Sequence, residues 1–314
     1  MAAKRGLLAL FLSGILGACA AGGPLEPPDS RRAVESDLVA VDGSPLAVSN
    51  WQAEEPNAII LALHGYGDYA ESTFAEAGKY WASAGLTTVA YDQRGFGRNT
   101  SRSFWPGADG LIADLKSVAR DLRRKYPCKS LILLGHSMGG GVALAASPEL
   151  DVDGLILAAP AIWGGEELNP FHRLAAWIAA TAVPDTRFTG EGVVRIQASD
   201  NIEMLRELGR DPLYLRPPSA REIWGLVRIT DMAEAASIDM RVPALLLLGE
   251  KDQIVPKRAV RRVFNQGDGP RQVVVYPEGW HLLFRDLQAE TVWEDVANWI
   301  AKVPRPSSCD QPAG

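Results

Sequence analysis

The stretch Leu131-Ile132-Leu133-Leu134-Gly135-His136-Ser137-Met138-Gly139-Gly140 decides the fold, because a short apolar run enters a G-x-S-x-G turn and leaves it as a helical pattern. Its glycines allow a sharp turn with Ser137 at the apex. The hydroxyl then lies at a helix N-terminus, where free N–H groups and the helix dipole favour an oxyanion. A glycine-rich turn with a capping serine is the alternative. The strand before it and the helix after it favour a nucleophile.

Outward from this turn, short apolar runs alternate with longer amphipathic ones, which is typical of a mostly parallel sheet covered by helices on both faces. Strands are predicted at Asn57–Leu63, Leu86–Tyr91, Ser130–Leu134, Gly154–Ala158, Ala244–Leu248 and Gln272–Val275, with weaker ones at Asp37–Val41 and Leu46–Asn50. Helices are predicted at Glu71–Ala84, Asp109–Tyr126, Met138–Ser147, Lys257–Asn265 and Leu287–Lys302.

A serine hydroxyl is a weak nucleophile at neutral pH and needs a histidine base, which in turn needs a partner to fix its tautomer. The chain has four histidines. His136 adjoins the serine on the turn, His64 precedes it, and His172 comes before the last strands. Only His281 satisfies the order nucleophile, acid, histidine that a strand–elbow–helix serine imposes.

The acid is expected after the strand Ala244–Leu248, because loops at the carboxyl edge of such a sheet carry the active site. The turn Gly249-Glu250-Lys251-Asp252 offers two carboxylates there, and Asp252 is preferred to Glu250. Asp268, in a Gly-rich loop before the last strand, is a distant third. Asp252 as a simple helix cap before Pro256 is the alternative.

The residues resemble the monoacylglycerol lipase and lysophospholipase group of α/β-hydrolases, often grouped with serine aminopeptidases. The likeness runs from Ala47 to Val303. Its motifs are Leu63-His64-Gly65-Tyr66-Gly67, Tyr91-Asp92-Gln93-Arg94-Gly95-Phe96-Gly97, the elbow itself, Gly249-Glu250-Lys251-Asp252 and His281-Leu282-Leu283-Phe284-Arg285-Asp286. Two positions depart from the group's patterns. Asn99 stands where the D-x-R-G-x-G-x-S pattern often has serine, and Gly279 is one residue closer to His281 than the corresponding glycine is to the histidine in lipases of the group.

The resemblance implies an α/β-hydrolase fold with a helical cap inserted before the strand that carries the acid. It implies a triad of Ser137, Asp252 and His281, with an oxyanion hole formed by the backbone N–H groups of Tyr66 and Met138. The expected reaction is ester hydrolysis through an acyl-enzyme, with no metal and no cofactor. No H-x-x-x-H or paired-cysteine pattern points to a metal site.

The segment 161–240 is too long for a plain connection and is predicted to be the cap, between core parts at 37–160 and 241–303. Four of its residues are candidates for substrate binding, namely Trp163, Trp177, Leu213 and Trp224. Phe171, Ile178, Tyr214 and Leu226 extend this apolar set. For any one of them, packing of the cap on the core is the alternative. Asp211-Pro212-Leu213 is assigned a structural role.

Composition describes an ordinary globular chain, since 47% of its 314 residues are hydrophobic and 22% are charged. The net charge of -6 and the lack of a long basic cluster disfavour nucleic acid as a partner. The expected partner is a small-molecule or lipid ester. The sequence leaves the oligomeric state open.

Residues 1–19 resemble an export signal, with Lys4 and Arg5 before an apolar run and Cys19 at a lipobox-like end. Lipidation of Cys19 would anchor the protein to a membrane in the cell envelope, and a plain secretory signal is the alternative. Residues 20–36 are predicted to be a flexible tether and 304–314 a tail. Cys128 and Cys309 either form a disulfide or remain two free thiols.

Three functions compete. They are hydrolysis of lipid monoesters such as monoacylglycerol or lysophospholipid, removal of N-terminal residues from peptides, and binding by a catalytically inactive scaffold. The intact triad disfavours the last. An aminopeptidase needs an anionic pocket for the substrate amine, for which the cap offers Glu166, Glu167 and Asp185.

Overall fold

The computed structural model describes residues 38–164, 167–188, 196–214 and 216–304. The predicted signal at 1–19 with Cys19, the tether at 20–36, and residues 305–314 with Cys309 lie outside these ranges. Cys128 is disulfide-bonded, and its pairing with Cys309 stays a prediction. Within the described residues, no helix is long and apolar enough to cross a membrane.

The core is a seven-stranded sheet in the order β1-β3-β2-β4-β5-β6-β7, parallel except for β1, which pairs antiparallel with β3. Its strands are β1 (Val48–Trp51), β2 (Ala58–Leu63), β3 (Leu86–Tyr91), β4 (Ser130–His136), β5 (Gly154–Ala158), β6 (Ala244–Gly249) and β7 (Arg271–Tyr276). Two predicted strands match their observed bounds, and the other main ones differ by one or two residues. The weak strand Asp37–Val41 is wrong, because the described residues there make only an isolated bridge between Val39 and Pro45.

The central strands are buried along their whole length. Every residue of β2, β4, β5 and β6 is buried, which explains their unbroken apolar sequences. Each fully buried Leu or Ile stabilises the fold by roughly 2 kcal/mol relative to an exposed one. Burial of these central strands therefore contributes a large part of the free energy that stabilises the sheet.

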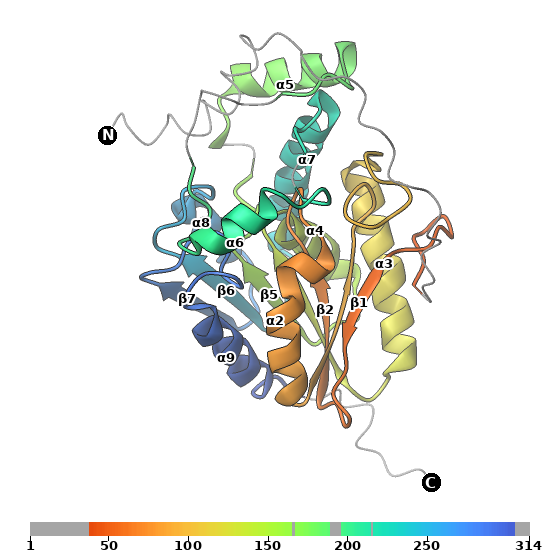
Figure 1. Ribbon diagram of the computed structural model, residues 1–314, viewed down its shortest axis with the longest axis vertical. Helices are drawn as coiled ribbons and strands as arrows, with labels where there is room; N and C mark the ends of the chain where they lie inside the picture. Colours follow the sequence, from red (N-terminus) through yellow and green to blue (C-terminus); the bar gives the residue numbers. More distant parts are fainter. Residues whose placement is uncertain (1–37, 165–166, 189–195, 215, 305–314) are drawn as a thin grey trace.

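Helices cover both faces of the sheet (Figure 1). One face carries α2 (Ala70–Ser83) and α9 (Ala289–Ile300), and the other carries α3 (Gly107–Lys125), α4 (Met138–Ala146) and α8 (Lys257–Phe264). The helix α7 (Ala220–Ser237) packs on α4. In α3, Leu111, Leu115, Val118 and Leu122 recur at helical spacing and are buried, while Arg120, Arg124 and Lys125 are exposed. A short 3-10 turn, η2 (Ser147–Glu149), follows α4.

The cap lies between β5 and β6 and contains α5 (Pro170–Ala182), α6 (Ile202–Leu208) and α7 in its described part. Asn169 begins α5 by accepting a hydrogen bond from the Phe171 N–H, and Ser219 begins α7 in a capping box with Glu222. Arg173 on α5 forms a bidentate salt bridge with Asp231 on α7, with N···O distances of 2.6 and 2.8 Å. The helical cap before the acid-bearing strand is as predicted.

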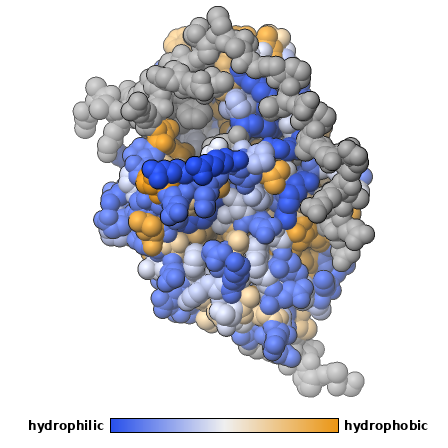
Figure 2. All heavy atoms as spheres, viewed as in Figure 1, coloured by the Kyte–Doolittle hydropathy of each residue, from blue (hydrophilic) through white to orange (hydrophobic). Residues whose placement is uncertain are grey.

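The outer face of α5 is apolar and exposed. Figure 2 shows apolar side chains at the end of the molecule where α5 lies. Four large ones have exposed fractions of 49 to 80%, namely Phe171, Leu174, Trp177 and Ile178. Contiguous exposed apolar patches on soluble domains mark contact with another molecule or a lipid surface.

Candidate active site

Ser137 occupies the strained turn between β4 and α4. Its backbone has φ 52° and ψ −116°, a conformation that is costly for a residue with a side chain. Glycines permit the close approach around it. A Cβ on Gly139 would lie 2.5 Å from the Leu63 carbonyl oxygen, and one on Gly135 would lie 2.4 Å from the Gly139 oxygen. The small glycines therefore allow a tight turn, from which the Ser137 side chain projects at the edge of the sheet.

This strain predicts that two inactive variants differ in stability. Ser137→Gly should exceed Ser137→Ala in free energy of unfolding by about 1 kcal/mol or more, because glycine adopts positive φ without the steric cost. Chemical denaturation of both variants measures the difference. Equal stabilities, or a more stable alanine variant, would show that the turn stores no strain.

Two hydrogen bonds join three side chains that are distant in sequence. The Nε2 atom of His281 lies 3.0 Å from the Ser137 Oγ, and its Nδ1 lies 2.9 Å from the Asp252 Oδ2. Ser137 follows β4, Asp252 follows β6 and His281 follows β7, so all three lie at the carboxyl edge of the sheet. His281 and Asp252 are buried, while Ser137 is partly exposed. The structure thus brings the predicted triad together in hydrogen-bonding order.

Asp252 is held as an oriented carboxylate. Its Oδ1 accepts hydrogen bonds from the Ile254 and Val255 N–H groups at 2.7 and 3.2 Å, leaving Oδ2 for the imidazole. Burial acts to raise the pKa of Asp252, but His281 and these backbone donors outweigh it and hold the pKa below its ordinary value. Glu250, by contrast, points to Lys257 at the surface, and Asp268 is exposed.

Two other histidines line the back of the site as neutral structural groups. The His136 Nε2 donates to the His281 carbonyl oxygen at 2.9 Å, and the His64 Nε2 accepts from the Gln93 N–H at 2.8 Å. Burial, and then the neighbouring His281, lower the pKa of His136 to about 3. Burial likewise lowers the pKa of His64. Neither ring contacts the Ser137 hydroxyl, in agreement with the choice of His281 by chain order.

The buried His136 predicts an acid-labile fold. Its pKa is about 3 folded and 6.5 in the unfolded reference, so its contribution is complete above pH 6.5 and is lost as the pH falls toward 3. In this window, the free energy of unfolding should fall more steeply for the wild type than for His136→Gln. The slopes should differ by up to about 1.4 kcal/mol per pH unit. Parallel urea-denaturation profiles from pH 7 to 4 would contradict this.

Tyr66 and Met138 lie where the oxyanion hole is predicted. A Cβ on Gly65 would stand 3.2 Å from the Ser137 Cβ, so the chain entering Tyr66 passes directly beside the nucleophile. Met138 begins α4 immediately after it. In the described part of the chain, neither backbone N–H donates to a protein acceptor. Their role as oxyanion donors stays a prediction, supported by this placement.

The four predicted substrate-binding residues are spread over the cap. Trp163 packs against the main core, and Leu213 lines a small cavity beside Gly67. Trp224 packs on a separate cluster of Leu168, Ala176 and Val227, while Trp177 is half-exposed on α5. Of these, Leu213 lies beside the loop that carries Tyr66. A shared acyl pocket for all four stays a prediction.

Sequence reasoning missed the charged contacts that tie the site to the cap. Glu222 on α7 is buried and accepts a hydrogen bond from the Tyr66 hydroxyl at 3.2 Å. Arg285 pairs with Asp68 and lies over the Tyr214 ring, joining the His281 loop to the Tyr66 loop. The Ser219-x-x-Glu222 spacing signals a capping box, but nothing local in the sequence reveals these long-range partners.

Two residues noted in the sequence have structural roles. Asn99 accepts from the Ala47 N–H at 2.8 Å and donates to the Asp92 carbonyl at 2.6 Å, so it ties together the loop after β3. Asp211 accepts from the Tyr69 hydroxyl at 2.6 Å and the Leu213 N–H at 2.7 Å, as its structural assignment implied.

Comparison with known proteins places the chain in a family. Residues 54–288 match the model of the family described as serine aminopeptidase, S33. The chain belongs to this family. The match covers the elbow, the acid-bearing turn and the late histidine, and the structure adds the α/β-hydrolase fold.

Three proteins that are similar to the chain are named as lipases or phospholipases. The chain is 24% identical to a monoacylglycerol lipase of Mycolicibacterium smegmatis, covering 85% of this chain and 96% of that one. It is 27% identical to a phospholipase of Bacillus subtilis, covering 78% and 95%. A solved monoglyceride lipase from Saccharomyces cerevisiae, in complex with a substrate analog, superposes with a TM-score of 0.71 at 19% identity, covering 90% and 99%. The chain is an enzyme, a carboxylester hydrolase.

Proposed function

We propose that the chain hydrolyses lipid monoesters through an acyl-enzyme on Ser137. The observation that carries this is the pair of hydrogen bonds from His281, at 3.0 Å to the Ser137 Oγ and 2.9 Å to the Asp252 Oδ2. A serine with its base in reach, and a base with its tautomer fixed by a buried carboxylate, is the arrangement that acyl transfer needs.

In the acylation step, the Ser137 Oγ attacks the ester carbonyl carbon while the His281 Nε2 takes the hydroxyl proton. The Asp252 carboxylate stabilises the imidazolium that results. The N–H groups of Tyr66 and Met138 hold the negative carbonyl oxygen. The carbon–oxygen bond to the alcohol then breaks, and the departing oxygen takes the proton from His281.

In the deacylation step, His281 takes a proton from water as the water oxygen attacks the acyl carbonyl carbon. The bond to the Ser137 Oγ breaks, the free acid leaves, and the proton returns from His281 to the serine. The same two hydrogen bonds thus serve both halves of the reaction.

A lipid substrate is supported by the cap. Its outer helix α5 exposes Phe171, Leu174, Trp177 and Ile178, an apolar face suited to a lipid phase. The named activities of the relatives, monoacylglycerol lipase and phospholipase, point in the same direction.

The described residues argue against the aminopeptidase alternative. Asp185 is exposed and pairs with Arg221 at 2.9 Å, and Glu167 is exposed. Glu222, a buried carboxylate of the cap, already contacts Arg216 at 2.5 Å and Tyr66. Glu166 lies outside the described residues. No free buried carboxylate among the described cap residues is therefore available for a substrate amine.

A substrate panel tests the proposal. Purified enzyme is assayed on 1-oleoylglycerol, 1-oleoyl lysophospholipids and aminoacyl p-nitroanilides, with Ser137→Ala as the blank. We expect turnover of the oleoyl esters and none of the anilides above the blank. Cleavage of the anilides in preference to the esters would establish the peptidase function instead.

We further propose export and lipidation at Cys19, which rest on the sequence of residues 1–19 alone. Expression of the full chain in a bacterium fed a radiolabelled fatty acid should label the wild type, and Cys19→Ser should remove the label. An unlabelled wild type in the culture medium would indicate a plain secretory signal.

A further inference from the structure

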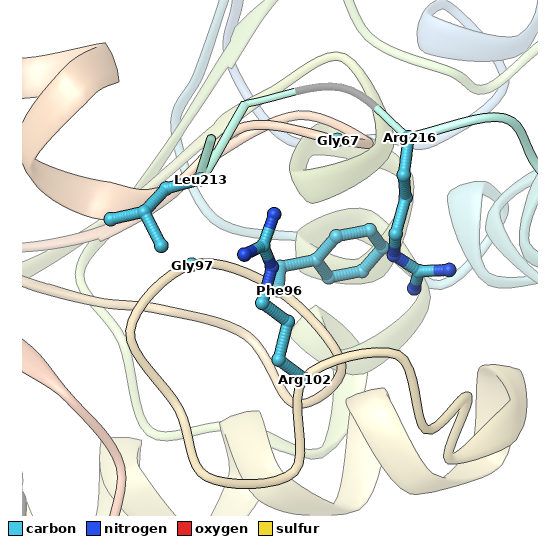
Figure 3. Close-up of a pocket in the computed structure, with 6 residues that line it drawn as sticks. All are labelled: Gly67, Phe96, Gly97, Arg102, Leu213 and Arg216. Carbon is cyan, nitrogen blue, oxygen red and sulfur yellow. The ribbon is translucent and has the colours of Figure 1, made fainter. Parts of the chain in front are cut away.

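The cap insert meets the core in more than one place beside the active site. In one place, Leu213 and Arg216 of the cap lie next to Phe96 in the loop after β3 (Figure 3). In another, cap residues 196–201 contact the loop 277–288, which joins β7 to α9 and carries the catalytic base. This second contact reaches the backbone of the base itself, so it can set the position of the imidazole.

The backbone of His281 is hydrogen-bonded to two other segments of the chain. Its N–H, together with the Leu282 N–H, donates to the Ala198 carbonyl oxygen of the cap, each at 3.0 Å. Its carbonyl oxygen accepts from the His136 Nε2 at 2.9 Å. Because the imidazole is attached to this backbone, a displacement of the loop also displaces the Nε2 atom that must reach Ser137.

The peptide before the base is held by a buried carboxylate, Asp286. The Asp286 Oδ2 accepts a hydrogen bond from the Trp280 N–H at 2.7 Å, across the turn that contains His281. The Asp286 Oδ1 accepts from the Ser199 hydroxyl of the cap at 2.6 Å. Only 3% of Asp286 and none of Ser199 is exposed, so water does not replace these partners.

Two acceptors are what this place in the loop needs. The Trp280 N–H and the Ser199 hydroxyl are both donors, and an ionised carboxylate offers an oxygen to each. The Ser199 Oγ also accepts from the Asn201 N–H at 3.1 Å, which directs the hydroxyl proton toward Asp286. Burial raises the pKa of Asp286 above its ordinary value, although these two hydrogen bonds oppose the rise. The carboxylate therefore occupies a costly position, in which it links the peptide before the base to the cap.

We propose that Asp286 is a positioning residue for the catalytic base, holding the Trp280 peptide while Ser199 of the cap orients its carboxylate. This inference rests on the proposed ester hydrolysis, in which His281 is the base. The cap would then act on the chemical step through the base, in addition to covering the site. Misplacement of a reacting group by about 1 Å can cost about 100-fold in rate, so loss of these hydrogen bonds should appear in kcat.

Kinetics on a short p-nitrophenyl ester test this role. Asp286→Ala removes both acceptors, and we expect kcat to fall about 100-fold while KM stays within about twofold. Asp286→Asn keeps an oxygen for the Trp280 N–H and should restore kcat to within about 10-fold of the wild type. A kcat for Asp286→Ala within threefold of the wild type, or an Asp286→Asn variant as slow as Asp286→Ala, would overturn the inference.

Asp295→Ala is the matched control. The Asp295 carboxylate on α9 accepts from the Tyr276 hydroxyl at 2.9 Å, so this variant also removes a carboxylate acceptor, outside the loop of the base. It should keep kcat within about threefold of the wild type, as expected away from the chemistry. Losses of kcat that are equal in Asp295→Ala and Asp286→Ala would contradict the positioning role.

Crystal structures of the variants give a readout that does not depend on turnover. The distance from the His281 Nε2 to the Ser137 Oγ is 3.0 Å, and in Asp286→Ala it should exceed about 3.5 Å, beyond hydrogen-bonding range. In Asp286→Asn it should stay within that range. An unchanged distance in a folded Asp286→Ala would overturn the inference.

Ser199→Ala keeps the test valid if Asp286→Ala does not fold, because it leaves the carboxylate in place and removes one hydrogen bond. It should lower kcat about 10-fold. In a His281→Ala background it should not lower the residual rate further, since its effect passes through the base. A further loss in that background, or full activity of Ser199→Ala alone beside an inactive His281→Ala, would overturn the inference and leave the proposed function standing. Full activity of His281→Ala would instead refute the proposed function.

Discussion

Ser137→Ala should lower kcat for a short p-nitrophenyl ester by at least about 10⁴-fold, because it removes the atom that attacks the carbonyl while leaving the rest of the site in place. The Ser137 Oγ is the group that His281 reaches at 3.0 Å, and an alanine methyl has no proton to give it. The residual rate should reflect only binding and the oxyanion donors. Stopped-flow or endpoint release of p-nitrophenol measures the loss.

Ser147→Ala is the matched control for this change. Ser147 ends the same helix that Ser137 begins, and its hydroxyl only donates back to the Leu144 carbonyl at 3.0 Å. It should retain wild-type turnover within about threefold, as expected for a site remote from the chemistry. Turnover by Ser137→Ala above a tenth of the control rate, with an unchanged circular dichroism spectrum, would remove Ser137 from the mechanism.

Asp252→Asn should reduce kcat by about 10³- to 10⁴-fold with little change in KM, since the amide neither fixes the productive tautomer of His281 nor stabilises the imidazolium. The variant is nearly isosteric. The hydrogen bonds from the Ile254 and Val255 N–H groups have an oxygen acceptor available, so the turn should remain folded. Steady-state kinetics on the same p-nitrophenyl ester give kcat and KM separately.

Glu250→Gln serves as the comparison for Asp252→Asn. It lies on the same turn, but its carboxylate is exposed and pairs with Lys257 at 3.3 Å. An exposed pair of this kind contributes roughly 0 to 1 kcal/mol, so both kcat and stability should change little. If Glu250→Gln cost as much activity as Asp252→Asn, the acid of the triad would have been assigned to the wrong residue.

The sheet and the triad were largely predictable, because strong local signals encode them. The apolar runs of β2, β4, β5 and β6 must be buried on both faces, and such runs are hard to mistake for surface segments. The elbow glycines mark Ser137. The order nucleophile, acid, histidine along the chain then selects His281 among the four histidines. The three residues can meet because the carboxyl ends of parallel strands lie at one edge of the sheet.

The cap contacts could not be predicted in the same way. The contact of Glu222 with Tyr66 spans 156 residues, and that of Arg216 with Gly95 spans 121, so no periodicity or spacing links the partners. Exposed charged residues have the same local pattern as buried ones. The weak strand predicted at Asp37–Val41 was wrong because strand pairing also depends on distant partners. The described residues there form a single bridge between Val39 and Pro45 and no ladder of strand hydrogen bonds.

The role of Ser137 as the nucleophile is tested most directly by trapping it. The enzyme is inactivated with a fluorophosphonate ester, and the adduct is located by mass spectrometry of the intact chain and of its peptides. We expect one adduct per chain, on Ser137, with loss of esterase activity in proportion to labelling, and none in Ser137→Ala. An adduct on another residue, or full esterase activity in a completely labelled protein, would contradict the central role of Ser137.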